Sequence, residues 1–167
     1  MSTLSFSQTL EEAKALVAQW KANGEKVVFT NGVFDILHIG HVHYLNLAKA
    51  QGQRLVVGLN ADSSVKRLGK GDNRPINPEE ARAGVLNGLK AIDAVVVFSE
   101  DTPLNLITTL LPDVLVKGGD YDPNETDERK KTYMVGSKEV RANGGTVVAI
   151  PLVEGFSTTG ILGKMIK

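Results

Sequence analysis

Two histidines on either side of a glycine, His38 and His41 around Gly40, are the side chains best suited to chemistry in this sequence. They follow an apolar run and stand where a helix is predicted to begin. The free N–H groups and the dipole of a helix N-terminus favour anions. A glycine lets a phosphate approach the backbone, and imidazoles add donors where charge develops during phosphoryl displacement. We therefore interpret this loop as a catalytic phosphate site.

Two simpler interpretations of these histidines stay open. They could satisfy local hydrogen bonds, or they could belong to a metal site, which needs further ligands in a chain without cysteine. The Walker pattern GxxxxGK[ST] is absent from this stretch, and so is the dinucleotide fingerprint GxGxxG. The kinase and dehydrogenase interpretations therefore lose their main support.

A basic cluster follows the second predicted strand and contains Lys66, Arg67, Lys70 and Arg74. We expect at least one of these cations to touch phosphate. Lys66 is the first choice for closing over the reacting groups, and Lys70 and Arg74 are assigned to the substrate. The alternative is a solvated face, because Asp62 and Asp72 are interleaved with the cations.

Two further loops follow predicted strands and could contact a nucleotide. In the segment Lys117-Gly118-Gly119-Asp120, the glycines let the backbone approach a flat base, and the carboxylate could accept from ribose or from metal-bound water. A tight turn that requires positive φ is the alternative. Ser157-Thr158-Thr159 begins the last predicted helix and offers hydroxyl and N–H groups to phosphate, or simply caps that helix.

The scaffold predicted to hold these loops is a parallel sheet. Short apolar runs predict strands at Lys26–Thr30, Arg54–Leu59, Ala94–Phe98, Val114–Lys117 and Thr146–Ile150. Helical patterns separate them, at about Leu10–Ala22, His41–Gln51, Asn77–Leu89, Thr102–Leu110 and from Ser157 onward. This alternation predicts a single α/β domain, Rossmann-like and doubly wound, with a five-stranded parallel sheet flanked by helices. Ligands bind at the carboxyl ends of such strands, which is where the candidate residues lie.

Composition narrows the class of partner. The chain has 19 Lys+Arg and 19 Asp+Glu, and only 5% of its residues are aromatic, so we expect neither a nucleic-acid partner nor a membrane partner. The N-terminus lacks the pattern of a signal peptide. No apolar run reaches the roughly 18 residues of a membrane span. We therefore expect a cytoplasmic protein.

The motifs resemble those of a known enzyme group. Gly32 to Asp35 followed by His38-Ile39-Gly40-His41 resembles the HxGH signature of the cytidylyltransferase-like nucleotidyltransferases, and Glu154 to Thr159 resembles the second signature of that group. Within the group, the sequence is similar to the heptose 1-phosphate adenylyltransferases of lipopolysaccharide precursor synthesis. The matching stretches are Thr30-Asn31-Gly32, Phe34 to His38, Lys66 to Leu68, Gly71-Asp72, Arg74-Pro75, Leu115 to Tyr121, Gly136 to Val140 and Asn143 to Gly145.

The resemblance implies a reaction. ATP would react with D-glycero-D-manno-heptose 1-phosphate by direct in-line attack, giving ADP-heptose and pyrophosphate. The implied catalytic residues are His38, His41, Lys66 and Arg82, the last with an intrahelical pair to Glu79 as its alternative. Mg²⁺ would rest largely on substrate phosphates, with Asp35 as an indirect metal ligand or a loop organiser. The implied nucleotide-binding residues are Thr30, Asn31, Gly32, Phe34, Asp35, Gly40, Lys117, Gly118, Gly119, Asp120, Ser157, Thr158 and Thr159.

The resemblance also implies a homodimer, and it covers about residue 26 to the C-terminus. We interpret residues 1–167 as one nucleotidyltransferase domain, with an N-terminal helix in 1–24 and a catalytic core in 25–167. Some members carry a fused sugar-kinase domain. We recognise no such domain in residues 1–167, so we expect the transferase to act alone. Gly69 and the segment Asp122–Val135 look like insertions, and we expect the longer one to cover the acceptor site.

Two rival functions stay open. A cytidylyltransferase that uses CTP and glycerol 3-phosphate, or a similar alcohol phosphate, would keep the chemistry and change the substrates. A non-catalytic module that senses nucleotides would bind ATP without releasing pyrophosphate. The two histidines together with the basic and hydroxyl groups favour an enzyme, because a sensor does not need all of them.

Overall fold

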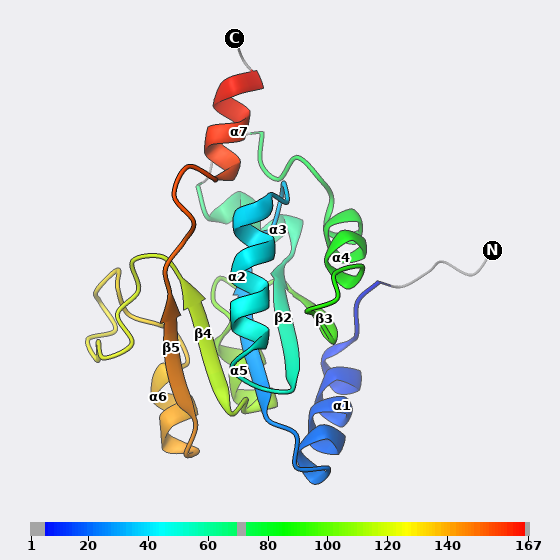
Figure 1. Ribbon diagram of the computed structural model, residues 1–167, viewed down its shortest axis with the longest axis vertical. Helices are drawn as coiled ribbons and strands as arrows, with labels where there is room; N and C mark the ends of the chain where they lie inside the picture. Colours follow the sequence, from blue (N-terminus) through cyan, green and yellow to red (C-terminus); the bar gives the residue numbers. More distant parts are fainter. Residues whose placement is uncertain (1–5, 70–72, 166–167) are drawn as a thin grey trace, which may run out of the picture.

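Five parallel strands form the centre of the protein, in the order β3-β2-β1-β4-β5 (Figure 1). The computed structural model describes residues 6–69 and 73–165. The strands are β1 Val27–Gly32, β2 Arg54–Asn60, β3 Ala94–Phe98, β4 Val114–Gly118 and β5 Thr146–Ile150. The predicted α/β fold with a five-stranded parallel sheet is confirmed. The chain reverses its direction of winding between β1 and β4, so a topological switch point lies there.

Helices cover both faces of the sheet, as the alternating pattern predicts. The helices are α1 Leu10–Ala22, α2 Ile39–Lys49, α3 Asp62–Arg67, α4 Glu79–Asn87, α5 Leu104–Leu110, α6 Ser137–Ala142 and α7 Thr158–Met165. α1 begins with the capping box that Thr9 and Glu12 form, in which each side chain accepts from the other residue's backbone N–H. Helices α2 and α4 pack on one face of the sheet, and α1, α5 and α6 pack on the other.

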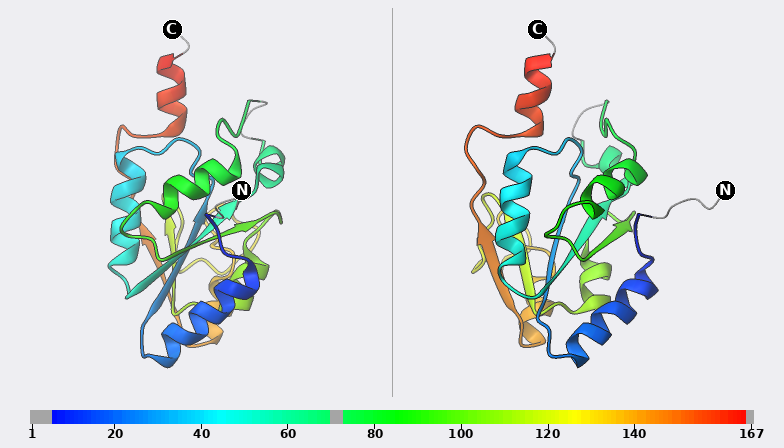
Figure 2. Two further views of the ribbon diagram at one scale, coloured as in Figure 1. Left: turned by 90° about the vertical axis from the view of Figure 1, so that its right-hand side faces the viewer. Right: turned by 45° about the vertical axis from the view of Figure 1, so that its right-hand side comes forward.

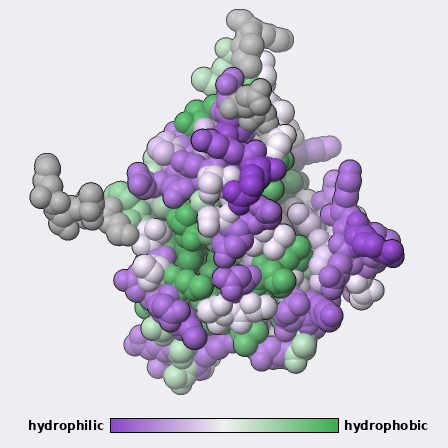
Figure 3. Space-filling view, turned by 180° about the vertical axis from the view of Figure 1, so that it is seen from behind, coloured by the Kyte–Doolittle hydropathy of each residue, from purple (hydrophilic) through white to green (hydrophobic). Residues whose placement is uncertain are grey.

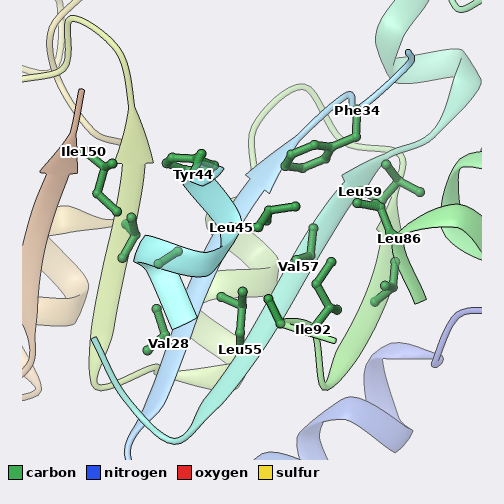
Figure 4. Close-up of a cluster of buried hydrophobic side chains, with 14 of the residues drawn as sticks. Val28, Phe34, Tyr44, Leu45, Leu55, Val57, Leu59, Leu86, Ile92 and Ile150 are labelled. Atoms are coloured by element: carbon green, nitrogen blue, oxygen red, sulfur yellow. The ribbon is translucent and has the colours of Figure 1, made fainter. Parts of the chain in front are cut away.

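The core on the α2 face reaches up to the carboxyl ends of the strands. Leu45 of α2 packs against Leu55 and Val57 of β2 in a cluster that excludes water (Figure 4). Phe34 and Tyr44 close this cluster at the end nearest the strand tips. The last layer of the core is therefore aromatic, and both rings also line the large cavity described below.

Two short helices lie where no helix was predicted. α3 occupies part of the basic segment after β2, and α6 precedes β5. Both have only six residues and a mixed polar sequence, so they show no apolar periodicity. Ser64 and Val65 of α3 are nevertheless buried against the sheet. Tertiary packing holds these turns, because a helix this short is marginal by itself.

The first described residues lie at an edge of the sheet, and the last described helix lies beyond the carboxyl ends of the strands. Gln8 pairs with Val96 at the open edge of β3, which places the N-terminal segment beside this edge strand. Helix α7 stands above the carboxyl ends of the strands, away from the body (Figure 2). None of its described residues is buried. The face of the protein that is turned away from the viewer in Figure 1 is shown in Figure 3. It has hydrophobic patches between hydrophilic side chains. In the described part of the chain, no helix is both long and apolar enough to cross a membrane.

Candidate active site

A cavity of about 730 Å³ lies at the carboxyl ends of the strands and gathers most of the predicted site residues. Its walls include Asn31, Gly32, Phe34, Asp35, His38, Gly40, His41, Arg74, Lys117, Gly118, Ser157, Thr158 and Thr159. These residues come from the ends of β1 and β4, from the loop before α2, from the loop before α4, and from the starts of α2 and α7. The volume falls in the range of about 300 to 1,000 Å³ that small-molecule sites occupy. The loops predicted from motifs far apart in the sequence therefore meet at one place.

The two histidines stack face to face at the start of α2. The ring centroids of His38 and His41 are 3.9 Å apart with an interplanar angle of 23°, and the ring of Phe34 meets His41 edge-on at 5.3 Å. Gly40 makes this arrangement possible, because a Cβ there would lie 2.9 Å from His38 Nδ1. The glycine thus provides space for the imidazole of His38, a reason the sequence did not reveal.

Burial favours the neutral form of His38. Burial lowers the pKa of this imidazole below its ordinary value. Its Nδ1 is buried and meets no hydrogen-bond partner among residues 6–69 and 73–165. A neutral imidazole carries one donor and one acceptor. The described residues also contain no cluster of three or more His, Asp or Glu that could hold a metal ion. Both His38 and His41 line the cavity, where they can contact a ligand.

Phe34 adopts a strained backbone conformation directly before the histidine loop. Its φ is 46°, in the left-handed region that bulky residues rarely adopt. Its ring folds back over Gly32, where a Cβ would lie 3.0 Å from the ring. Strain of this kind concentrates at functional loops. The ring packs between the core and His41, so it fixes the position of that imidazole.

Asp35 organises the loop that leads to α4. Its carboxylate accepts hydrogen bonds from Arg74 Nε at 2.5 Å and from the backbone N–H groups of Ile76 and Asn77 at 2.9 Å. Burial raises the pKa of Asp35, but these hydrogen bonds and the Arg74 charge outweigh it and hold that pKa below its ordinary value. Both oxygens are engaged. Of the two predicted roles, the structure therefore favours loop organiser over metal ligand.

Arg74 lines the cavity while Asp35 holds it. Only its Nε contacts the carboxylate, and its side chain is 10% exposed. Its two terminal nitrogens donate to no atom in the described part of the chain, so they are available to an anion. The fork of two nitrogens suits a phosphate. This position agrees with the predicted substrate role, which stays a prediction.

The guanidinium of Arg82 is turned into the protein interior and does not face the cavity, so its predicted phosphate contact stays a prediction without support from this structure. Its donors meet the carbonyl oxygens of Val33, Asn60 and Asn77 and the carboxylate of Asp62 at 2.6 to 2.9 Å. The side chain is fully buried and does not line the cavity. The alternative pairing with Glu79 is not formed, since the Arg82 guanidinium pairs with Asp62 instead. Arg82 is a structural residue that ties three loops together.

Lys66 and Arg67, the two other described basic residues of this segment, are not at the cavity. Lys66 lies on the exposed side of α3 and does not line the cavity, so the loop position predicted for it is wrong. Arg67 pairs with Asp101 at 2.6 Å on the surface. Lys70 lies outside the described residues. Lys66 therefore reaches the substrates only if α3 or its surroundings move, and its catalytic role stays a prediction.

The glycine segment after β4 serves the packing of the cavity floor. A Cβ on Gly118 would lie 2.9 Å from the ring of Tyr44, so a larger residue would displace that ring. Gly119 has a φ of 98°, which agrees with the tight-turn alternative. Asp120 is exposed and, like Gly119, lies outside the cavity walls. Thr30, another predicted nucleotide-binding residue, is buried beneath the cavity walls. Its Oγ1 lies 2.6 Å from the phenol oxygen of Tyr44.

Ser157 caps α7, and the neighbouring threonine ties this helix to the histidine loop. The hydroxyl of Ser157 accepts from the Gly160 N–H at 3.0 Å, as an N-cap does. Thr158 Oγ1 donates to the carbonyl of Ile36 at 3.4 Å. Thr159 lines the same cavity. Three residues that carry hydroxyl groups thus line the cavity together with the histidines.

Three tyrosines line the cavity although the sequence did not single them out for a function. Tyr44 lies on α2, Tyr121 follows β4, and Tyr133 belongs to the segment 122–135, which was interpreted from the sequence as an insertion. That segment is held by the Asp122 N–H to Thr132 carbonyl bond at 3.0 Å and by the Glu125–Lys130 ion pair at 2.7 Å. An aromatic residue in a sequence is usually interpreted as part of the core. The fold was therefore needed to place these three tyrosines at the cavity.

The fold and the site define a nucleotidyltransferase of the HxGH type, and the chain belongs to the cytidylyltransferase-like family, whose profile matches residues 29–163. Members of this family act on a nucleoside triphosphate. The predicted enzyme class is thereby confirmed.

The chain is also similar to particular curated proteins. It is 56% identical over 167 residues to the bifunctional protein HldE of Coxiella burnetii, covering 99% of this chain and 33% of that protein. It is 56% identical over 157 residues to HldE of Shigella sonnei, covering 94% of this chain and 31% of that protein. The chain therefore spans about a third of the length of these relatives.

The chain is also similar to solved structures. The lipopolysaccharide core biosynthesis protein from Thermoplasma volcanium is 30% identical, with a TM-score of 0.59 over 78% of this chain and 98% of that chain. The pantoate-beta-alanine ligase from Francisella tularensis shares 13% identity, with a TM-score of 0.59 over 93% of this chain and 74% of that chain. The second similarity concerns the fold alone.

Proposed function

We propose that this chain joins AMP from ATP to D-glycero-D-manno-heptose 1-phosphate, giving ADP-heptose and pyrophosphate. The stacked pair of His38 and His41 at the N-terminus of α2 is the observation that carries the proposal, because it places donors where a transferring phosphate needs them. Similarity to HldE along nearly the whole chain and to a lipopolysaccharide core biosynthesis protein supports the choice of acceptor.

The reaction is a single displacement at phosphorus. An oxygen of the sugar phosphate forms a bond to the α-phosphorus of ATP, and the bond from that phosphorus to the bridging oxygen breaks. Pyrophosphate leaves with the electron pair. The imidazoles and the backbone N–H groups at the start of α2 stabilise the charge on the phosphoryl oxygens. We assign the terminal nitrogens of Arg74 to a phosphate of the substrates.

Mg²⁺ would enter with the phosphates of ATP, where it neutralises negative charge. The described residues supply no ligand set for the ion, since Asp35 is engaged by Arg74 and by two backbone N–H groups. We therefore assign no step to a protein-bound metal.

We assign the wall formed by the inserted segment 122–135 to the acceptor. Tyr133 and Val135 face the cavity from this segment. An aromatic ring offers a flat apolar surface to the carbon–hydrogen face of a sugar. A Tyr133→Ala variant should raise the KM for the sugar phosphate and leave the KM for ATP unchanged. An unchanged KM for the sugar phosphate would remove this assignment.

By the same resemblance, we propose a cytoplasmic homodimer that works without nucleic acid or membrane. The exposed side chains of Leu152, Phe156 and Met165 around α7 support a contact between copies. Light scattering coupled to gel filtration would measure the mass in solution, and a mass of 17.9 kDa would contradict the dimer.

Labelled ATP tests which phosphate is transferred. With label at the α-phosphate, the sugar nucleotide should carry the label, and with label at the γ-phosphate, pyrophosphate should carry it. Label from the γ-phosphate on the sugar would indicate a kinase and contradict the proposal. No transfer from either position, with ATP still bound, would favour the sensing module.

A further inference from the structure

A crevice opens in the sheet between β1 and β4, directly beneath the cavity. These two strands pair at Val28–Val114 and at Phe29–Leu115. β1 continues beside β2 as far as Gly32, and β4 continues beside β5 as far as Gly118. Beyond the last pair between them, β1 and β4 therefore separate, at the switch point where open α/β sheets bind ligands.

Two side chains span this crevice. Asn31 and Lys117 lie three residues beyond the pair Val28–Val114 on their respective strands, so they stand at the same level. The Lys117 ammonium donates a hydrogen bond to Oδ1 of Asn31. Both residues line the cavity. The crevice is thus bridged by a cation and an amide rather than by backbone hydrogen bonds.

The chemistry of the ammonium fixes the orientation of the amide. A lysine ammonium has donors only, so the atom of Asn31 that meets it must be the oxygen. The amide nitrogen then points away from Lys117. Within residues 6–69 and 73–165, Nδ2 of Asn31 has no acceptor. It therefore presents N–H groups to a ligand in the cavity that Asn31 lines.

The surroundings hold Lys117 in place. The residue is 8% exposed, and its Nζ lies 5.6 Å from the centroid of the Tyr121 ring. On the floor beside it, Tyr44 is hydrogen-bonded to Thr30 and packs where a Cβ on Gly118 would lie. Burial raises the pKa of Tyr44, so this phenol stays protonated and its hydrogen bond persists. A rigid floor of this kind holds a donor in place before the ligand arrives.

We infer that Lys117 is a positioning residue that orients the Asn31 amide, so that its nitrogen donates to a phosphate oxygen of the bound substrates. A donor needs an acceptor, and the neighbouring histidines and Arg74 already suit phosphate. The charge of Lys117 beneath the amide also favours an anion above it. The inference rests on the proposed function. It adds a phosphate contact at the β1–β4 crevice, from either the nucleotide or the acceptor.

Asn31→Asp is the sharpest test, because it changes almost no volume. The new carboxylate keeps its contact with Lys117 as an ion pair, but it presents an oxygen instead of N–H groups to the phosphate. Titration calorimetry would measure the Kd of ATP alone and the Kd of heptose 1-phosphate alone. We expect one of them to weaken by about 10- to 100-fold, the effect of one hydrogen bond to a charged group. The thermal midpoint should not fall.

A double-mutant cycle separates orientation from charge. Lys117→Met removes the donor to Asn31, whereas Lys117→Gln keeps an N–H donor without the charge. We expect the Met variant to weaken the same ligand as Asn31→Asp does, and the Gln variant to retain most of the affinity. Adding Lys117→Met to Asn31→Ala should change the Kd by less than about threefold, because residues that act through one another are not additive.

Three results would overturn the inference. These are unchanged Kd values for both ligands in Asn31→Asp, equal losses in Lys117→Gln and Lys117→Met, or additive losses in the double variant. If Lys117→Met does not fold, Asn31→Asp and Lys117→Gln still decide. Failure of the proposed function is a different observation, namely no pyrophosphate from the wild-type protein. In that case the ATP titration alone decides the inference.

Discussion

The Arg74 guanidinium and the Asp35 carboxylate form a buried ion pair, with Nε 2.5 Å from Oδ2, that joins the loop before α4 to the loop before α2. The carboxylate is fully buried and also caps two backbone N–H groups. Removing one partner of such a pair leaves an uncompensated buried charge. The pair therefore supports both the fold and the position of a cation that faces the cavity.

Asp35→Asn should lower the free energy of unfolding by about 3 to 5 kcal/mol, the cost of breaking a buried pair from one side. The variant should also weaken substrate binding, because Arg74 loses its anchor. Urea unfolding would measure the first effect. Asp101→Asn, which removes the exposed pair with Arg67, is the matched control and should cost less than about 1 kcal/mol. Equal stability of Asp35→Asn and the wild type would contradict this account.

The acid stability of the protein should depend on Asp35. The pKa of this carboxyl is held below its ordinary value of 3.8, so the unfolded chain takes up this proton first as pH falls. The stabilisation is fully present above that ordinary pKa and is lost as pH falls through the lower folded pKa. Urea unfolding of wild type and Asp35→Asn between pH 7 and pH 2 should show their difference shrinking toward the acid end. A difference that is constant with pH would be inconsistent with the ion pair.

Gly40→Ala should reduce turnover without destabilising the protein. A Cβ would lie 2.9 Å from His38 Nδ1 and displace the imidazole, whereas alanine favours the helix by up to about 1 kcal/mol. We expect kcat to fall at least about tenfold, since one misplaced catalytic donor costs that much or more. Gly163→Ala in α7 is the control, because a Cβ there meets nothing within 4 Å. Unchanged kcat in Gly40→Ala would show that the His38 position is not needed.

Arg82→Met should act on stability and not on chemistry. It leaves three carbonyl oxygens and the Asp62 carboxylate without their buried donor, at a cost of about 3 kcal/mol or more. The fraction that remains folded at low temperature should turn over at close to the wild-type rate. Active-site titration combined with urea unfolding measures both. A stable variant with a large loss of kcat would restore the catalytic role predicted from the sequence.

The sequence predicted the loops of the site better than the direction of their long side chains. Strand ends and helix starts follow from local patterns, so the histidine loop and the segments at Lys117 and Ser157 were placed correctly. The direction of the Arg82 side chain was not predictable, because a helical arginine can turn toward a ligand or into the interior, and carbonyl groups from distant loops decide which. The sequence around Arg82 does not reveal which distant carbonyl groups will lie beside it.

The features that the sequence did not predict also depend on contacts between distant parts of the chain. The six residues of α3 hold Lys66 on the outside because Ser64 and Val65 face the sheet, a choice made by tertiary contacts. The stacking of His38 on His41 depends on the space at Gly40, which a motif indicates only as a glycine. The pairing of Asn31 with Lys117 needs the register of β1 and β4, which no single strand encodes.

Pyrophosphate release tests the central claim most directly. The purified protein would be given Mg²⁺ and either ATP or CTP, each with heptose 1-phosphate, glycerol 3-phosphate and other sugar phosphates. We predict turnover with ATP and heptose 1-phosphate, and a loss of at least about 100-fold in His41→Ala, the scale of removing one donor to a developing oxyanion. Turnover with another pair would keep the mechanism and contradict the substrates. No pyrophosphate from any pair, with ATP still bound, would contradict the assignment of this chain as a catalyst.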